Sequence, residues 1–496
     1  MRKHLLPVLL LVAAVWFLYS QTGRFEFLRL DDHDYTFRCA FVKDGLSAAN
    51  VKEAFANPRH AAIWMPATYI SYMADITLFG PGMGPHHLVN VALHTLNALL
   101  LYALLLALLP RTADAPGGTR AVASAALALL ATAFWALHPQ RVEAVAWIAG
   151  RKELLCALFT LLGLHCWLRP GRRWTLAATL CCALACMSKP TAMCFPFLAF
   201  AVACLNDTTL TTDNAPPKTR PLTAYLPLLA LAVATGALAV YSQTHPEGRP
   251  ELALFTASLP WRLLNAAVST GLYLFQALVP VGLHLDYRAT PGHFPLDGLL
   301  GFATLAAAAL VFGFILYRAW KNLKGRQADD GTGTDAQERV PPVLTVRRLL
   351  ALLLFFCAAL APTLGIFGSF GEAARADRFF YLPSLALSFG LGFFVLDLSR
   401  TARRGRRALP SQSVPGPQPD VPGRPHPKPQ RSPKTGLPPL PALAALVVLV
   451  DFGAAFPLVA SYRNDYTAFS RTLACDPDNG RALAHVASEE CARFGR

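Results

Sequence analysis

Long apolar blocks rich in alanine and leucine dominate this sequence, and short polar stretches separate them. Of its 496 residues, 54% are hydrophobic and only 15% are charged. An apolar stretch of about 20 residues can cross a bilayer as a helix, which satisfies its own backbone hydrogen bonds in the absence of water. The sequence therefore predicts an all-α polytopic membrane protein and argues against a soluble globular domain.

The hydropathy pattern predicts about eleven crossing helices. The first is Met1–Ser20, with an apolar part at Leu5–Tyr19, and it is long enough if it tilts. A further apolar stretch, Leu263–Pro280, is predicted to be re-entrant or interfacial, because a crossing there would move two basic loops to the outer face. The other predicted crossings are 86–109, 121–138, 153–168, 174–188, 191–205, 222–241, 297–317, 347–367, 381–398 and 439–459.

Basic residues fix the predicted orientation. Arg2 and Lys3 precede the first span, and the loops 318–326 and 400–407 are rich in arginine and lysine. The positive-inside rule places these segments in the cytoplasm, so the tail after the last span lies outside. These basic loops contribute to the net charge of +15. They can also attract the anionic headgroups of membrane lipids. No nucleic-acid-binding motif is present, and no cysteine–histidine spacing is typical of a zinc site.

The chain divides into a membrane domain, 1–460, and a short tail, 461–496. Residues 21–85 form a long first outer loop. Two linkers interrupt the membrane domain, Gln327–Pro342 and Pro410–Pro441. The second is rich in proline, arginine and lysine, so we expect a disordered cytoplasmic loop there, overlapping the 410–441 range.

Two adjacent carboxylates, Asp31 and Asp32, lie just beyond the first span on the predicted outer face. A carboxylate pair at this place is suited to general-base work on a substrate that the bilayer delivers. The alternative is ordinary solvated charge, because acidic residues often flank membrane helices.

A second polar segment runs from His138 to Glu153. If it is helical beyond Pro139, then Glu143, Trp147 and Arg151 recur every four residues and share one face. A carboxylate, an indole and a guanidinium in a row could hold a sugar and a phosphate. The alternative is an intrahelical salt bridge beside an interfacial tryptophan.

Cations at the predicted outer ends of apolar segments form a third set, Lys189, Arg262 and Arg378. Arginine and lysine bind phosphodiester headgroups, although snorkelling to lipid is the alternative for each. The histidines His86, His87 and His94 recur at helical spacing. Packing or hydrogen bonding explains them better than metal binding.

These motifs resemble, in order along nearly the whole membrane region, the GT-C glycosyltransferases. The likeness is to the transmembrane and tetratricopeptide-repeat (TMTC-type) O-mannosyltransferases and their bacterial relatives. The matching stretches are Asp31-Asp32, Trp64–Thr68, Ser71–Met73, Phe79-Gly80, His86–Asn90, Leu93-His94, Leu137–Pro139, Arg141–Glu143, Ala146–Glu153, Ser188-Lys189, Phe195–Phe197, Arg262, Asn265-Ala266, Tyr273, Pro280 and Ala376–Pro383.

The resemblance implies a lipid-linked sugar donor and transfer on the outer face. It assigns the role of base toward the acceptor to Asp31 or Asp32, and makes Glu143 a second acid that aids the acceptor or a metal. The group that holds the donor phosphate would be drawn from Arg151, Lys152, Lys189, Arg262 and Arg378. The substrate-binding residues would be His87, His138 and Trp147.

We therefore expect a GT-C-like hexosyltransferase of a bacterial inner membrane. It would move a sugar such as mannose from a polyprenyl-phosphate carrier to a periplasmic protein or glycan, with the anomeric centre inverted. The cofactor is unknown, and a divalent cation is left open. The tail holds about one tetratricopeptide repeat, whereas a stable array needs at least three. The alternatives are a transporter or polymerase of lipid-linked sugars, and an inactive membrane scaffold.

Overall fold

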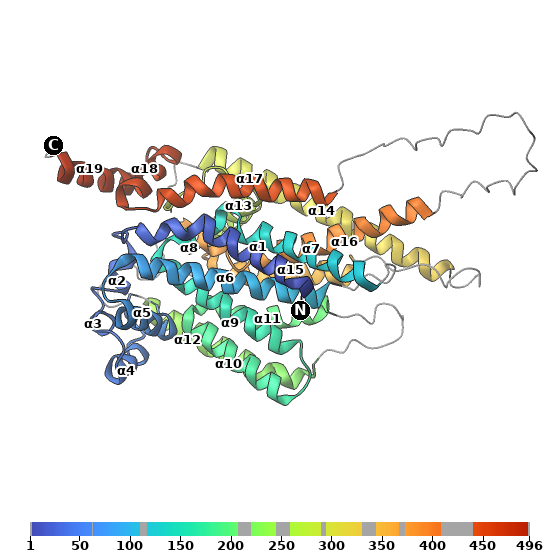
Figure 1. Ribbon diagram of the computed structural model, residues 1–496, viewed down its shortest axis with the longest axis horizontal. Coiled ribbons are helices and arrows are strands. Elements are labelled where there is room, and N and C mark those ends of the chain that lie inside the picture. The colour runs from blue at the N-terminus through green and yellow to red at the C-terminus, as the bar shows by residue number, and fades with distance from the viewer. Residues whose placement is uncertain are drawn as a thin grey trace, which may run out of the picture.

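Helices account for almost all of the computed structural model of this chain (Figure 1). It describes residues 2–61, 63–109, 117–206, 220–244, 258–288, 294–329, 344–366, 373–407 and 440–494. Long helices run side by side along the bundle. They are α1 (Arg2–Tyr19), α6 (Met83–Leu108), α7 (Gly117–Ala136), α9 (Arg151–Trp167), α10 (Arg172–Ser188), α11 (Phe195–Leu205), α12 (Leu226–Thr244), α13 (Leu259–Leu278), α14 (Phe294–Asp329), α15 (Val346–Leu360), α16 (Leu385–Arg407) and α17 (Leu440–Ser461).

Short helices connect these rods or follow them. They are η1 (Ser20–Arg24), α2 (Asp31–Tyr35), α3 (Ala40–Lys43), α4 (Ala48–Ala56), α5 (Pro66–Phe79), η2 (Pro139–Arg141), α8 (Val142–Ala146), η3 (Ile148–Gly150), η4 (Pro190–Cys194), η6 (Leu222–Tyr225), η9 (Ala361–Thr363), η10 (Asp377–Phe380), α18 (Asp465–Cys475) and α19 (Gly480–Phe494). Two short strands, β1 (Tyr287–Arg288) and β2 (Ala373–Arg375), pair antiparallel with Tyr287 opposite Arg375.

Six helical stretches of the described chain are long and apolar enough to cross a membrane: His4–Arg24, Met83–Leu108, Leu222–Thr244, Gly298–Lys321, Val346–Thr363 and Ala444–Ser461. Three shorter apolar helices accompany them, Ser124–Ala136, Pro190–Leu205 and Leu385–Leu398. The predicted class, an all-α polytopic membrane protein, is thus confirmed. Each of the predicted crossings falls on a helix, but the number that cross stays a prediction.

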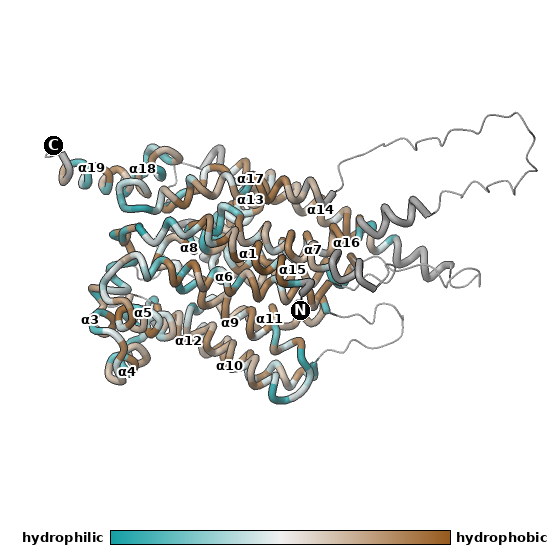
Figure 2. The backbone as a smooth tube through the Cα atoms, in the orientation of Figure 1, coloured by the Kyte–Doolittle hydropathy of each residue, from teal (hydrophilic) through white to brown (hydrophobic). Residues whose placement is uncertain are grey.

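Polar residues gather at one end of the bundle, on the left in Figures 1 and 2. We call it the polar end, and define it by Asp31–Asp34, His138–Glu153, Ser188–Pro196 and Arg375–Pro383. The rods behind it are mostly brown in Figure 2, as expected for helices that face lipid and one another.

The segment predicted as re-entrant or interfacial corresponds to α13. Its C-terminal turn reaches the polar end, where the carbonyl of Ala277 lies 3.2 Å from Nε2 of His138. Near its beginning, Arg262 donates a hydrogen bond to the carbonyl of Ile366, beyond α15, at 3.0 Å. It is not among the six long apolar stretches. Its placement relative to a membrane stays a prediction.

Most of the two predicted linkers lies outside the described residues. The structure describes only Gln327–Asp329 of the first, at the end of α14, and Leu440-Pro441 of the second, at the start of α17. The predicted tail contains two packed helices, α18 and α19, and its likeness to one tetratricopeptide repeat stays a prediction.

Helices α13 and α14 approach closely where two glycines face each other. A Cβ atom on Gly271 would lie 1.8 Å from the carbonyl oxygen of Gly301, which is much closer than atoms can approach. Glycines at a helix contact allow such close approach of two backbones. Substitution should therefore force these helices apart.

We predict that Gly271→Ala destabilises the protein by about 1–3 kcal/mol, the usual cost of overpacking. Gly313→Ala is the matched control, because it lies on α14 with nothing within 4 Å of its Cβ position. Thermal unfolding in detergent should show a lower midpoint for Gly271→Ala alone. Equal midpoints for the two variants would contradict this account of the contact.

Candidate active site

Four helices and one connecting residue bring charged side chains together at the polar end. Helix α2 carries Asp31, α8 carries Glu143, and the first turn of α9 carries Lys152 and Glu153. The residue between α10 and η4 is Lys189, and η10 carries Arg378. We call these six residues the charge cluster. It contains two of the three predicted acids and three of the five predicted phosphate ligands.

The helix expected through Glu143, Trp147 and Arg151 is broken, so that prediction is wrong. Helix α8 ends at Ala146, and Trp147 is extended, with φ −86° and ψ 129°. A single turn, η3, then leads to α9. The close return of the chain requires Gly150, since a Cβ atom there would lie 2.3 Å from the carbonyl oxygen of Ala144. Glu143 and Arg151 consequently point to different partners.

Every charge in the cluster faces one of opposite sign. Lys152 Nζ lies 3.3 Å from Asp31 Oδ2, and Lys189 forms an ion pair with Glu153. The guanidinium of Arg378 forms an ion pair with Glu143. The carboxylate of Glu143 also accepts a hydrogen bond from the backbone N–H of Arg378, at 2.8 Å. The six charges therefore form three pairs.

Two aromatic rings join these pairs. The guanidinium of Arg378 lies 4.8 Å from the ring centre of Trp147, and the ammonium of Lys152 lies 5.6 Å from it. Phe379 lies between Arg378 and Lys189 in the same manner, at 4.9 and 4.8 Å. Such cation–π contacts strengthen where water is excluded. Trp147, predicted to bind substrate, thus contacts two of the cations of the cluster, Arg378 and Lys152.

Electrostatics keeps Arg378 charged. Burial alone would lower the pKa of this guanidinium, but Glu143, together with Asp31 and Glu153, raises the pKa above its ordinary value. These three carboxylates therefore act on Arg378 jointly. A cation held in this way remains ionised at any physiological pH.

Exposure separates Asp31 from the other members of the cluster. Its side chain is 26% exposed and that of Arg378 is 13% exposed. The side chains of Lys152, Glu153 and Lys189 are at most 7% exposed, and that of Glu143 is completely buried. Of the acids in the cluster, Asp31 is thus the one that a substrate can reach.

Its neighbour Asp32 has a different environment. The side chain is completely buried, and its two oxygens accept hydrogen bonds from the backbone N–H groups of Leu28, at 2.9 Å, and Ala149, at 2.8 Å. Burial raises the pKa of this carboxyl to about 7. Both oxygens are engaged, so Asp32 joins the segment before α2 to η3, and its predicted role as a base stays a prediction.

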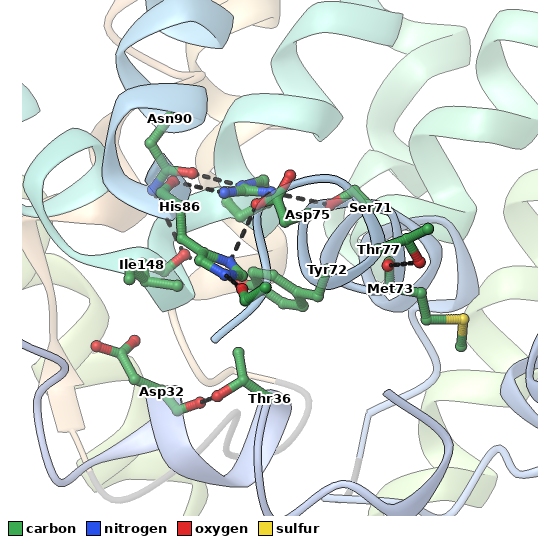
Figure 3. A network of polar contacts seen from close by, with 12 residues as sticks. Asp32, Thr36, Ser71, Tyr72, Met73, Asp75, Thr77, His86, Asn90 and Ile148 are labelled. Atoms are coloured by element: carbon green, nitrogen blue, oxygen red, sulfur yellow. Dashed lines mark hydrogen bonds and ion pairs between the residues drawn. The ribbon is translucent and has the colours of Figure 1, made fainter. Parts of the chain in front are cut away.

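Arg151 belongs to a separate network, drawn in Figure 3 around Asp75, His86 and Asn90. Its completely buried guanidinium donates to Asp75 Oδ2 at 2.6 Å, to Asn90 Oδ1 at 2.5 Å and to the carbonyl of His86 at 2.7 Å. The structure therefore does not bring Arg151 into the charge cluster. Sequence reasoning missed Asp75, although an acid within the apolar stretch 68–78 was a visible signal.

The other predicted ligands are also engaged elsewhere. The ring nitrogens of His87 lie 2.8 and 3.3 Å from the carbonyls of Ala146 and Glu26. Nδ1 of His138 accepts from the backbone N–H of Gln140, which caps η2. Arg262 has its contact at Ile366, as described above. These contacts stabilise the fold, and a substrate role for these three residues stays a prediction.

Within the described residues, no group of three or more histidine, cysteine, aspartate or glutamate side chains is arranged to hold an ion. Glu143, which the resemblance suggested as an aid to a metal, is engaged by Arg378.

Comparison with known proteins finds sequence similarity over only part of this chain. Over 109 residues, 22% of this chain, the sequence is 34% identical to the protein O-mannosyl-transferase TMTC4 of mouse and 33% identical to the human protein of that name. The chain matches only 14% of the length of these relatives. No family model and no solved structure matches. The similarity supports a membrane glycosyltransferase in general terms and leaves donor and acceptor open.

We predict that Asp32→Asn lowers stability by about 1–3 kcal/mol, because asparagine offers one acceptor oxygen to two buried N–H groups. The raised pKa of Asp32 also means that the folded protein binds more protons than the unfolded chain between the ordinary value of 3.8 and about 7. Its contribution to stability therefore falls as the pH rises through this range, and is constant above it. Thermal unfolding of the variant should lack that part of the pH dependence.

Asp34→Asn is the control for this experiment, since Asp34 lies on the same helix and is partly exposed beside Arg38. It should leave both the midpoint and its pH dependence close to those of the wild type. An Asp32→Asn protein that also unfolds like the wild type at every pH would show that Asp32 does not join the two segments.

We predict that Arg151→Gln costs about 3–5 kcal/mol, because it leaves Asp75 buried without its cation. The double variant Arg151→Met with Asp75→Leu removes both charges and should recover most of that loss. Thermal unfolding of the three proteins in detergent measures both effects. If Arg151→Gln were as stable as the wild type, the network in Figure 3 would not be a structural one.

Proposed function

We propose that this protein is a membrane glycosyltransferase of the GT-C type, which moves a sugar from a polyprenyl-phosphate carrier to a hydroxyl of a protein or glycan. The observation that carries the proposal is the reachable carboxylate of Asp31 beside Lys152, in a cluster that also holds Arg378 and Lys189. The partial similarity to a protein O-mannosyl-transferase supports the same class of reaction.

In the proposed reaction, Asp31 accepts the proton of the acceptor hydroxyl. The hydroxyl oxygen forms a bond to the anomeric carbon while the bond between that carbon and the phosphate oxygen breaks. The electron pair leaves with the polyprenyl phosphate, and one displacement inverts the anomeric centre. Cations near the leaving oxygen stabilise the charge that develops there. Lys152, Arg378 and Lys189 are the cations in position for this role.

The cluster also suggests which acid performs which task. Glu143 is buried against Arg378, so its proposed role is to hold that guanidinium toward the donor phosphate. Asp31 is partly exposed, which suits a group that must exchange a proton with a substrate. Trp147 provides the surface on which the sugar or the phosphate lies beside the two cations.

The test is sugar transfer in membranes that contain the full chain, with radiolabelled polyprenyl-phosphate sugars as donors. Asp31→Asn should reduce the rate about 10²- to 10⁴-fold, the usual contribution of a general base, in protein that is still inserted and folded. Asp34→Asn, on the same helix, should keep the wild-type rate.

Each outcome has a distinct meaning. Transfer by the wild type and by Asp34→Asn, but not by Asp31→Asn, would support the assignment. An Asp31→Asn protein with the full rate would remove the proposed base. Absence of transfer by correctly inserted wild-type protein with every donor would favour the transporter or scaffold instead.

A further inference from the structure

The C-terminal helices α18 and α19 pack against each other, and α18 contacts the preceding helix α17 (Figure 1). A capping box at Asn464 and Thr467 starts α18. The rings of Phe469 and His485 are stacked, with their centres 4.0 Å apart, and join the two helices. The pair therefore forms a defined unit of structure, whose contacts with the rest of the chain can be traced individually.

One set of contacts holds the segment that leads into α2. The backbone N–H of Glu26 donates to the carbonyl of Arg463 at 2.8 Å. The backbone N–H of Arg29 donates to Asp465 Oδ1 at 2.8 Å, and its guanidinium lies 3.5 Å from Asp465 Oδ2 and 2.9 Å from Glu489 Oε1. Arg29 is two residues from Asp31. The helix pair therefore fixes the backbone on which the proposed base is carried.

A second set of contacts holds the loop before β1. The side chain of Arg471 donates to the carbonyl of Leu283 at 2.9 Å, and that of Asn479 to the carbonyl of Asp286 at 3.1 Å. The adjoining residue, Tyr287, donates its hydroxyl hydrogen to Asp377 Oδ2 at 2.9 Å. Asp377 immediately precedes Arg378. The same helix pair is thus linked, through Tyr287 and Asp377, to the segment that carries Arg378.

We propose that α18 and α19 act as a clamp that holds Asp31 and Arg378 in catalytic register, with Arg29 and Asp465 as positioning residues. This proposal rests on the proposed function, because it is the transfer reaction that needs the register. The side chain of Arg29 is 61% exposed, so its ion pairs add little to stability. Asp465 is nearly buried and uses both oxygens on Arg29, which fixes position. A misplacement of about 1 Å can cost about 100-fold in rate.

The test compares wild type, Asp465→Ala and Arg29→Met, with Glu490→Gln as the control. Glu490 is exposed on the same helix as Glu489. Amide hydrogen exchange of the full chain in detergent is followed at residues 25–35 and 373–383. A clamp predicts that Asp465→Ala accelerates exchange about tenfold or more at both segments, although Asp465 contacts only the first. Glu490→Gln should change neither.

Transfer kinetics provide the second readout. Asp465→Ala and Arg29→Met should lower kcat about tenfold or more while the donor KM changes less than about threefold, since the cations of the cluster remain. Arg29→Lys, which keeps a cation for Asp465 and Glu489, should recover part of the rate. A merely structural role would lower the amount of folded protein and leave kcat unchanged.

Two results would overturn the clamp. One is exchange at 373–383 that stays at the wild-type rate in Asp465→Ala and Arg29→Met. The other is a kcat in both variants equal to that of Glu490→Gln. If the wild type transfers no sugar, the proposed function fails by itself. Amide hydrogen exchange then still decides whether the helix pair couples residues 25–35 to residues 373–383.

Discussion

Two backbone N–H groups from distant parts of the chain, those of Leu28 and Ala149, share the carboxylate of Asp32. Because a buried carboxylate needs such partners, the burial of Asp32 brings the segment before α2 together with η3. That junction places Asp31, the next residue, beside Lys152 at the start of α9. The geometry of the charge cluster therefore depends on a completely buried acid that is not itself a member of the cluster.

The class of the fold and its polar end were predictable from sequence. Apolar blocks longer than about 17 residues predict helices regardless of their partners, and basic loops sort the polar segments between two faces. The division of labour between Asp31 and Asp32 was not predictable. Two adjacent, identical residues differ only in which backbone groups surround them, and that information arises from contacts more than a hundred residues away.

The segment around Trp147 shows why regular four-residue spacing wrongly predicted a continuous helix. Glu143, Trp147 and Arg151 have helical spacing, but the turn at Gly150 brings the backbone against the carbonyl of Ala144 and ends the helix. A glycine inside a helical pattern was a local signal of such a break. The partners of the released side chains, Arg378 for Glu143 and Asp75 for Arg151, lie far away in the sequence. Spacing alone therefore could not identify them.

The pairing of all six charges in the cluster affects which anions can bind there. Three cations beside three carboxylates produce little net field, so a small anion diffusing in water gains little on entering and must separate existing ion pairs. An anion attached to a long apolar chain is already concentrated at the membrane surface and needs less attraction from the protein. The balance of charges in the cluster therefore disfavours small soluble phosphates more than it disfavours an anion that is already held at the membrane surface.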